Sequence, residues 1–427
     1  MTSDSAGCAN NLVFVNRYFD PDQSATSRML TDLAQALAAR GITIHVVCSR
    51  QLYDDPDALL PRDEIRSGVT VHRVATTRFG RSRLIGRAID YLSFYVSAGM
   101  ALMALLKSGD MLIAKTDPPL ISIVAAVIAR LKRASLVNWQ QDVFPEVASH
   151  LGANPFPRPL DLILRRLRDW SMRAAKVNVV IGTRMFEYFQ QRGIPVSRLC
   201  VIDNWADDET ITPRSTETNA LRERLGLTDR FVVCYSGNLG RAHEFDTLLA
   251  AADDLRLEEA IVFLMIGGGA RMVPLQRAVE ARALDNFLFL PYQPREDLED
   301  SLAAADVHLV SLLPALEGFI MPSKLYGILA AGRPVIFIGD SDGDTARIIR
   351  NAECGITVPV GAGGDLAAVI RRLMREPDAR IAMGARARTV LTSSYSRSIA
   401  VDRWLTVLDV KRERRSAGDQ PRALSNR

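Results

Sequence analysis

Residues 231–252 read FVVCYSGNLGRAHEFDTLLAAA, and this stretch decides the fold. A run of β-branched and aromatic residues, typical of a buried strand, ends in Ser-Gly-Asn-Leu-Gly, and a helix is expected to begin near Glu244. A strand, a glycine-containing turn and a helix form the repeating unit of a parallel α/β sheet. The stretch therefore predicts an α/β protein.

The same unit recurs along the chain. A helix is expected at residues 24–40, and the polar stretch IDNWADDETITPRSTETN, residues 202–219, is predicted to be a linker. The runs predicted to be strands are residues 11–19, 42–49, 69–75, 110–116, 134–142 and 176–183 before the linker, and 231–240, 260–269, 286–292, 305–313 and 333–339 after it.

Two doubly wound parallel sheets of the Rossmann-like type follow from this pattern, one on each side of the linker. We place the first domain at residues 1–205 and the second at 206–395, followed by a helix at 396–412 and a basic tail at 413–427 that is expected to be disordered. Ligands of open parallel sheets lie beyond the carboxyl ends of the strands. The loops of the two domains are therefore predicted to face each other across a cleft.

Composition excludes several classes of protein. The chain has 427 residues, 48% of them hydrophobic, and a net charge of only +4. Its five cysteines and five histidines are scattered without CxxC or HExxH spacing, which argues against a structural metal and for a reducing compartment. No secretory signal opens the sequence. We therefore expect a cytoplasmic protein without a structural metal.

Basic residues are unevenly distributed. Residues 73–87 hold five arginines and no acid, and residues 158–176 and the tail are also basic. Such runs are either solvated faces or surfaces attracted to anionic lipid or another polyanion. Nucleic-acid binding is disfavoured, because the runs lack interleaved aromatic residues.

Two apolar stretches bear on membrane contact. Tyr91–Leu106 and Pro118–Ala129 are uncharged but shorter than the roughly 20 residues that span a bilayer. Both are predicted to be mostly buried helices, and the first could also lie shallowly in a membrane surface.

The turn after residue 235 is the first candidate site for an anion. Its glycines would let backbone amides approach a ligand, and Arg241 and His243 could reach anionic oxygens. An ordinary strand-to-helix turn explains the same residues. The donor-binding candidates of this turn are Gly237, Asn238, Leu239, Gly240 and His243.

A second glycine cluster, Gly267, Gly268 and Gly269, also ends a predicted strand. It contains GxG, but Met272 occupies the sixth position of GxGxxG, so the dinucleotide fingerprint is not met. These glycines are expected to give room for a base or ribose, or to form a tight turn.

The third candidate is EGFIMPSKLYGILAAGRPVI, residues 317–336. Lys324 follows Pro322 and Ser323 and is predicted to lie in the first turn of a helix, where the helix dipole already favours an anion. A phosphate-bearing ligand would explain this lysine, whereas a lysine directed at Glu317 or solvent would not need one. Leu325 and Tyr326 complete this set of donor-binding candidates.

The chain resembles bacterial family 4 glycosyltransferases of the GT-B fold, of the branch that acts in cell-surface polysaccharide biosynthesis. The resemblance spans residues 18–336 in the family's order. The matching stretches are YFDPDQSATSRMLTDLAQALAARGITIHVVCSR, NWQQDVFPEVASHLG, VIDNWAD, YSGNLGRAHEFDTLLAA and PSKLYGILAAGRPVI.

The resemblance implies retaining transfer of a sugar from a nucleotide-diphosphate donor, with a UDP-sugar favoured and no metal or other cofactor. The second domain would hold the donor, and the last helix would return to the first domain. The family's diphosphate-binding lysine is replaced by His243, and its ribose-binding glutamate by Gly327, with Glu317 two residues out of register. Arg241 and Lys324 are therefore our candidates for stabilising the leaving diphosphate.

The first domain would hold the acceptor. Asp142, at the end of a predicted strand, could orient the acceptor hydroxyl or contact the donor sugar, or could simply cap a helix. Asn204 could touch the donor. The loop after the first strand is expected either to contact the acceptor or to cap a helix, through Asp22, Ser24, Ala25 and Thr26.

The expected acceptor is a polyprenyl-diphosphate-linked glycan at the inner leaflet, with the protein bound peripherally to that membrane. Two alternatives stay open: a nucleotide-sugar 2-epimerase-like enzyme of the same fold, and a nucleotide-sugar-binding subunit that has lost catalysis.

Overall fold

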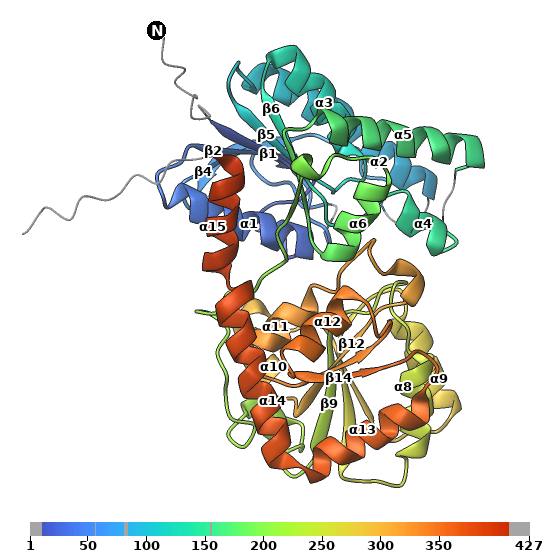
Figure 1. Cartoon of the computed structure of the whole chain (residues 1–427). Coiled ribbons are helices and arrows are strands. Elements are labelled where there is room, and N and C mark those ends of the chain that lie inside the picture. The colour runs from blue at the N-terminus through green and yellow to red at the C-terminus, as the bar shows by residue number, and fades with distance from the viewer. Residues whose placement is uncertain (1–10, 56, 81–83, 154–155, 410–427) are drawn as a thin grey trace, which may run out of the picture.

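The computed structural model describes residues 11–55, 57–80, 84–153 and 156–409, which form two α/β lobes (Figure 1). Each lobe contains one sheet with helices on both faces, and the long helix α14 runs along the second lobe toward the first. The predicted fold class is confirmed. Residues 81–83 of the basic run and the predicted tail at 413–427 lie outside the described residues.

The first lobe is built on an eight-stranded sheet in the order β3-β4-β2-β1-β5-β6-β7-β8. All described neighbours pair in parallel except β3 and β4, which form an antiparallel hairpin that the sequence did not predict. The strands are β1 (Leu12–Val15), β2 (Ile44–Ser49), β3 (Asp63–Arg66), β4 (Val69–Val74), β5 (Met111–Lys115), β6 (Ser135–Trp139), β7 (Val177–Val180) and β8 (Leu199–Val201).

Side chains of the central strand alternate between two helical layers. Leu12 and Phe14 of β1 pack in a core with α1 and α15, whereas Val13 and Val15 pack in a core with α2 and α3. This alternation buries both faces of the sheet, as a parallel sheet requires. The helices are α1 (Ala25–Ala38), α2 (Leu84–Leu105), α3 (Ile121–Lys132), α4 (Glu146–His150), α5 (Arg158–Ala174) and α6 (Thr183–Gln191).

The second lobe holds a six-stranded parallel sheet in the order β11-β10-β9-β12-β13-β14. The helix expected to begin near Glu244 begins at Asp246, and the sequence did not predict β14. The strands are β9 (Phe231–Asn238), β10 (Ile261–Gly268), β11 (Phe287–Leu290), β12 (Val307–Ser311), β13 (Val335–Ile338) and β14 (Gly355–Val358). The helices are α7 (Ala220–Arg224), α8 (Asp246–Asp254), α9 (Met272–Ala281), α10 (Leu298–Ala303), α11 (Lys324–Ala330), α12 (Asp344–Asn351), α13 (Gly363–Arg375) and α14 (Pro377–Val390).

The chain crosses between the lobes at two adjacent places. Ala206 donates its backbone N–H to Tyr395 O and accepts from the N–H of Arg397, so the two crossings are hydrogen-bonded to each other. After the second crossing, α15 (Arg397–Leu408) lies on the first lobe. The predicted late helix thus ends at Leu408 within the described residues.

Aromatic rings hold α15 to the first lobe. The fully buried ring of Trp404 meets Trp139 edge to face at 4.8 Å between centroids, and Trp139 stacks on Trp205 at 5.8 Å. The last helix is therefore part of the hydrophobic core of the first lobe.

Replacing Trp404 tests this anchor. Trp404→Ala is expected to lower the free energy of unfolding by about 3–5 kcal/mol, because it empties a buried aromatic site. Urea denaturation followed by circular dichroism measures the effect. Thr406→Ala, on the exposed side of the same helix, should change stability by less than about 0.5 kcal/mol. Equal effects of the two substitutions would contradict the assignment.

Candidate functional site

The glycine-rich ends of β9 and β10 pack directly against each other. Gly237 pairs with Gly267 in the sheet, and a Cβ on Gly267 would lie 2.4 Å from Gly237 O. A Cβ on Gly269 would lie 2.6 Å from Leu239 O, and both Gly267 and Gly269 have φ near +120°. The tight-turn explanation therefore accounts for Gly267 and Gly269, while a role in donor binding stays a prediction for them and for Gly268.

Lys324 lies against this turn. It is the first residue of α11, and its Nζ lies 3.5 Å from the centroid of the Tyr235 ring and 3.4 Å from Asn238 O. Burial lowers the pKa of Lys324 well below 10.5, and no acidic side chain of the described chain pairs with it. The Lys324 amine thus lies next to the glycine turn, directed neither at Glu317 nor simply into solvent.

The two residues after Lys324 have a structural role. The side chains of Leu325 and Tyr326 are fully buried in the core of the second lobe, which leaves only their backbone for a ligand. Ser323 is the N-cap of α11 but makes no side-chain capping hydrogen bond. Pro322 is buried at the start of this turn.

His243 also contacts Tyr235. Its ring meets the Tyr235 ring edge to face at 5.9 Å, and Nδ1 lies 2.5 Å from Ser311 O. Burial and then the nearby Lys324 lower the pKa of His243 to about 3. The ring is therefore neutral near pH 7, with the Nδ1–H donating to the carbonyl, so His243 does not replace the charge of a lysine.

Arg241 is on the same loop but is exposed. It makes no hydrogen bond or ion pair with any residue that the structure describes. Its predicted role in binding a diphosphate stays a prediction. Gly240 is on the same turn, where Leu239 is buried and Asn238 is exposed.

The Glu317 side chain contacts the start of α12. Its Oε1 accepts a 2.8 Å hydrogen bond from the backbone N–H of Asp344, at the start of α12, while Oε2 is buried without a partner. Burial raises the pKa of Glu317 to about 7. The structure thus gives Glu317 a contact with the start of α12, and its role in donor binding stays a prediction.

The start of α12 also touches the first lobe. Asp344 Oδ2 accepts a 2.9 Å hydrogen bond from the N–H of Arg184 in α6, and Arg184 Nη2 donates to Asp342 O at 3.1 Å. A single carboxylate therefore lies at the N-termini of two helices, one from each lobe.

The loop after β6 meets the loop that leads to Lys324. The N–H of Val143 donates to Phe319 O at 2.9 Å, and the Phe319 ring lies 5.0 Å from the rings of His150 and Tyr188. Asp142 precedes Val143. The structure therefore brings the Asp142 loop of the first lobe against the 317–324 loop of the second.

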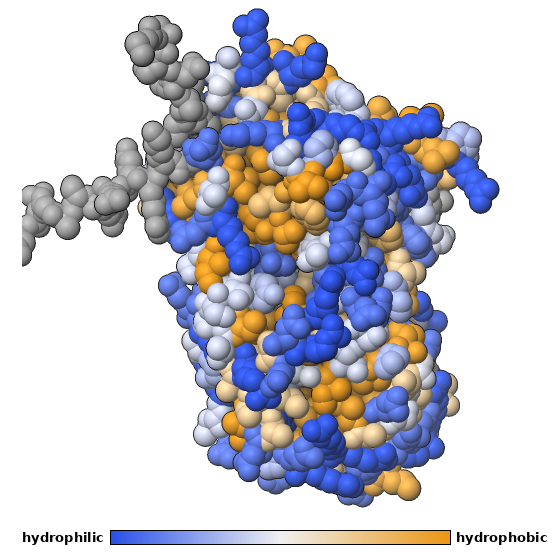
Figure 2. Space-filling model, in the orientation of Figure 1, coloured by the Kyte–Doolittle hydropathy of each residue, from blue (hydrophilic) through white to orange (hydrophobic). Residues whose placement is uncertain are grey.

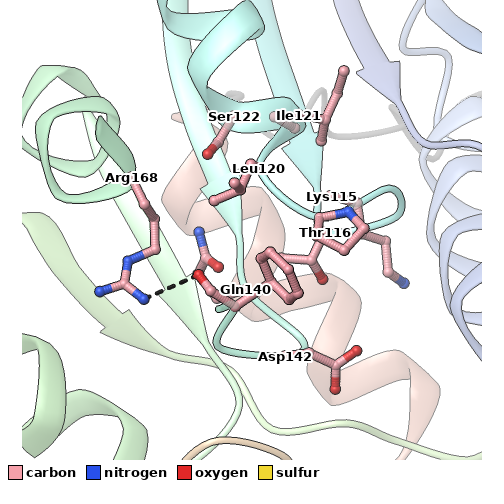
Figure 3. A pocket seen from close by; sticks show the side chains of 11 residues that line it. Lys115, Thr116, Leu120, Ile121, Ser122, Gln140, Asp142 and Arg168 are labelled. Atoms are coloured by element: carbon pink, nitrogen blue, oxygen red, sulfur yellow. Dashed lines mark hydrogen bonds between the residues drawn. The ribbon is translucent and has the colours of Figure 1, made fainter. Parts of the chain in front are cut away.

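Asp142 lies at a small pocket beyond the carboxyl ends of β5 and β6 (Figure 3). Its side chain reaches solvent, yet the surrounding protein raises its pKa to about 6 by desolvation; nearby Asp117 adds to this shift and Lys115 opposes it. Thr116, Gln140 and Arg168 line the same pocket. Asp142 is thus a carboxyl group that gains or loses its proton close to neutral pH.

The sequence did not predict that Lys115 lies at this site. It is fully buried at the end of β5, its Nζ lies 3.8 Å from the centroid of the Trp139 ring, and it donates to Thr26 O at 2.9 Å. Burial lowers the pKa of Lys115 well below 10.5. A lysine inside a predicted strand gives no sequence signal, because its role depends on which loop it meets.

The loop after β1 is held by its own polar groups. Asp22 Oδ1 accepts from Ser24 N–H at 2.9 Å, and its Oδ2 accepts from the N–H of Tyr53. Thr26 Oγ1 lies 3.4 Å from Asp117, and Ala25 is exposed at the start of α1. Local turn formation thus explains Asp22, while acceptor contact stays a prediction for all four candidates.

The loop containing Asp142 has a buried ionic support that the sequence did not reveal. Arg168 of α5, shown in Figure 3, donates to Phe144 O at 3.2 Å. It also donates to both Glu146 and Asp169, and all three ionic side chains are buried. Asn204 is buried and accepts a 2.9 Å hydrogen bond from Gln141, so it supports the loop that contains Asp142. Within the described residues, no group of three or more potential metal ligands occurs.

Two family models match the chain: "Glycosyl transferase 4-like domain" over residues 24–205 and "Glycosyl transferases group 1" over residues 217–390. The probable glycosyltransferase WbjE of Pseudomonas aeruginosa is 25% identical over 77% of this chain and 81% of its own length. The putative colanic acid biosynthesis glycosyl transferase WcaI of Escherichia coli (strain K12) is 24% identical over 76% of this chain and 82% of its own.

Solved structures share the fold. Anabaena Alr3699/HepE in complex with UDP and glucose has a TM-score of 0.70 at 16% identity, covering 93% of this chain and 99% of that one. WaaG, a glycosyltransferase involved in lipopolysaccharide biosynthesis, has a TM-score of 0.68 at 16% identity over the same shares. At this identity the likeness shows the GT-B architecture alone.

The contact of the Glu317 carboxyl group with the start of α12 can be tested without a ligand. Because its pKa in the folded protein, about 7, exceeds the usual 4.5, the folded state holds the proton more tightly than the unfolded state. Stability is therefore lost as the pH rises from about 4.5 through 7. Glu317→Gln, which stays neutral, should be more stable than the wild type at pH 8 by about 1–3 kcal/mol and nearly equal to it at pH 5.

Urea unfolding at both pH values measures this difference. Asp229→Asn, at an exposed loop carboxylate, serves as the control and should show no pH-dependent gain. A gain for Glu317→Gln that is the same at pH 5 and pH 8 would refute the assignment.

Proposed function

Because this chain belongs to the family 4-like glycosyltransferases of the GT-B fold, with polysaccharide-biosynthesis enzymes among its relatives, we propose that it transfers a sugar with retention from a UDP-sugar to a hydroxyl of a lipid-linked glycan. One observation carries the proposal. The hydrogen bond from Val143 to Phe319 joins the loop of Asp142 to the loop of Lys324 across the two lobes.

Lys324 would stabilise the leaving diphosphate. A charge-assisted hydrogen bond contributes about 1.5–3 kcal/mol, and this lysine has no competing carboxylate among the described residues. The adjacent turn at Gly237 brings backbone close to the same ammonium group, 3.9 Å from the position of an added Cβ. A diphosphate at this turn would favour the charged form of Lys324, because an adjacent anion raises the pKa of an amine.

The acceptor hydroxyl would lie near Asp142. In the proposed step, the bond between the anomeric carbon and the phosphate oxygen breaks, and the acceptor oxygen bonds to the same face of the sugar. The departing phosphate oxygen takes the hydroxyl proton, which yields the glycoside and UDP. Asp142, as a carboxylate, would accept a hydrogen bond from that hydroxyl and orient it.

UDP is favoured as the nucleotide because solved relatives of this fold are complexes with UDP and UDP-glucose. A relative from Mycobacterium tuberculosis is named as a GDP-mannose-dependent mannosyltransferase, so GDP-sugars belong in the same test. The proposed acceptor is a polyprenyl-diphosphate-linked glycan at the inner leaflet of the cytoplasmic membrane. Incubation with UDP-, GDP- and dTDP-sugars and membrane lipid extract, followed by mass spectrometry, tests donor and acceptor together; no sugar-bearing lipid from any donor would refute the proposal.

Removing the cation should weaken donor binding. Lys324→Ala is expected to lower affinity for UDP at least tenfold, about 1.4 kcal/mol, by isothermal calorimetry. We expect the same minimum loss for Arg241→Ala if its exposed side chain closes on the diphosphate. Arg372→Ala, at an exposed arginine on α13, is the control and should leave the affinity unchanged. Unchanged affinity in both test variants, with the fold intact, would contradict the donor site.

The pKa of Asp142 sets the expected pH profile. The wild-type kcat/KM should rise with pH through an apparent pKa of about 6, because the carboxylate is the form that accepts a hydrogen bond. Asp142→Asn should reduce kcat/KM at least tenfold at pH 8 and lose this rise. A variant that keeps the same rise would show that another group titrates.

A further inference from the structure

An exposed apolar surface covers the outer side of the first lobe, away from its sheet. Helix α2 presents one side to the core through Phe94, Ala98 and Leu102, which are fully buried. Its opposite side is exposed to solvent. The exposed residues on that side are Ile85, Ile89, Leu92, Val96, Met100 and Met103.

The spacing of these six residues, in steps of three or four, places them in one stripe along the helix. From Ile85 to Met103 the stripe is about 27 Å long at 1.5 Å per residue. By length and composition, Ile85–Leu105 is apolar enough to cross a membrane. Only 22% of its most apolar 18-residue stretch is buried inside the protein. The prediction of a mostly buried helix was therefore wrong for α2.

Two neighbouring helices extend the surface. Helix α3 packs against both α2 and α5, and it exposes Val127 and Leu131. Helix α5 lies at the upper right of the first lobe in Figure 1, where Figure 2 shows mostly hydrophilic side chains with small apolar areas between them. The exposed apolar residues of α5 are Leu160, Leu162, Ile163, Leu167 and Trp170.

The exposed charges on these three helices are basic. Arg130 and Arg166 are exposed and form no ion pair with any described residue. Asp90 and Asp169 are buried, and Asp161 is partly buried and paired with Arg165 at 2.7 Å. No acidic residue of α2, α3 or α5 is therefore fully exposed, so the surface complements an anionic partner.

A bilayer fits this surface better than a groove-binding partner does. The apolar residues are spread over three helices and flanked by arginines, which is the composition of helices that lie in a membrane interface. Since the inner side of α2 is part of the protein core, the helix can lie in the interface but cannot cross it. We propose that α2, α3 and α5 form a docking surface for an anionic phospholipid bilayer, with the apolar side chains in the interface and the arginines at lipid phosphates.

The same surface adjoins the proposed acceptor side. Asp90 of α2 pairs with Arg17 in the loop after β1 at 3.9 Å, and the N–H of Arg17 donates to Asp117 O in the loop after β5. Tyr95 of α2 donates to Pro119 O in that loop. Docking would thus place the loops around Asp142 near the membrane; this consequence rests on the proposed function, whereas the docking surface does not.

Vesicle binding of the full chain, without any nucleotide sugar, tests the surface. The wild type should co-sediment with vesicles of phosphatidylcholine and phosphatidylglycerol, and bind at least tenfold more weakly to pure phosphatidylcholine. The triple variant Leu92→Gln, Val96→Gln, Met100→Gln should bind anionic vesicles at least tenfold more weakly than the wild type. Arg130→Gln with Arg166→Gln should reduce the preference for anionic lipid.

A matched control replaces three exposed apolar residues of the second lobe. Leu257→Gln, Val273→Gln, Ile381→Gln should bind vesicles within twofold of the wild type. Unfolding curves and UDP affinity of every variant should match the wild type, which separates loss of docking from loss of fold or of the donor site.

Two results would overturn the proposal: a wild type that binds no anionic vesicle, and an α2 variant that binds as well as the wild type. The main alternative is that a second copy of the chain binds this surface, and light scattering tests it. A wild type that is dimeric and binds no vesicles, together with a monomeric α2 variant, would assign the surface to that second copy. Vesicle binding without sugar transfer would refute the proposed function and leave the docking surface standing.

Discussion

The contact of the Lys324 amine with the end of β9 is the constraint on which the rest of the site depends. The lysine lies over the Tyr235 ring, beside the Asn238 carbonyl, without an acidic partner among the described residues. Taking a charge out of water costs free energy unless another charge compensates it. Burial accordingly lowers the pKa of Lys324, and an anion bound at the glycine turn would stabilise its charged form.

The second requirement is that the lobes meet where the candidate residues are. The Asp142 loop reaches the 317–324 loop through Val143 and Phe319, and Asp344 joins the starts of α6 and α12. The buried ion pairs of Arg168 with Glu146 and Asp169 support the Asp142 loop. The candidate site is thus built from one loop of each lobe, and each lobe supplies its own candidate residue, Asp142 or Lys324.

Sequence reasoning gave the two sheets and the neighbourhood of Lys324, because both follow from local patterns of apolar runs, glycines and helix starts. It did not give the hairpin partner β3, whose residues Asp63–Arg66 lack an apolar run. It could not give Lys115 or Arg168, since a buried lysine or arginine acquires its role from loops distant in sequence. For the same reason the sequence did not reveal that the Glu317 side chain accepts a hydrogen bond at the start of α12; its role in donor binding stays a prediction.

The paired crossings at Ala206 and Tyr395 have a mechanical consequence. Two segments that are hydrogen-bonded side by side resist shear and twist more than they resist bending. We therefore expect the paired crossings to act as a hinge between the lobes. The relative motion of the lobes is then reduced largely to a single angle. A molecule that bridges them has to restrict only that angle, and it loses correspondingly little of its binding energy to ordering the protein.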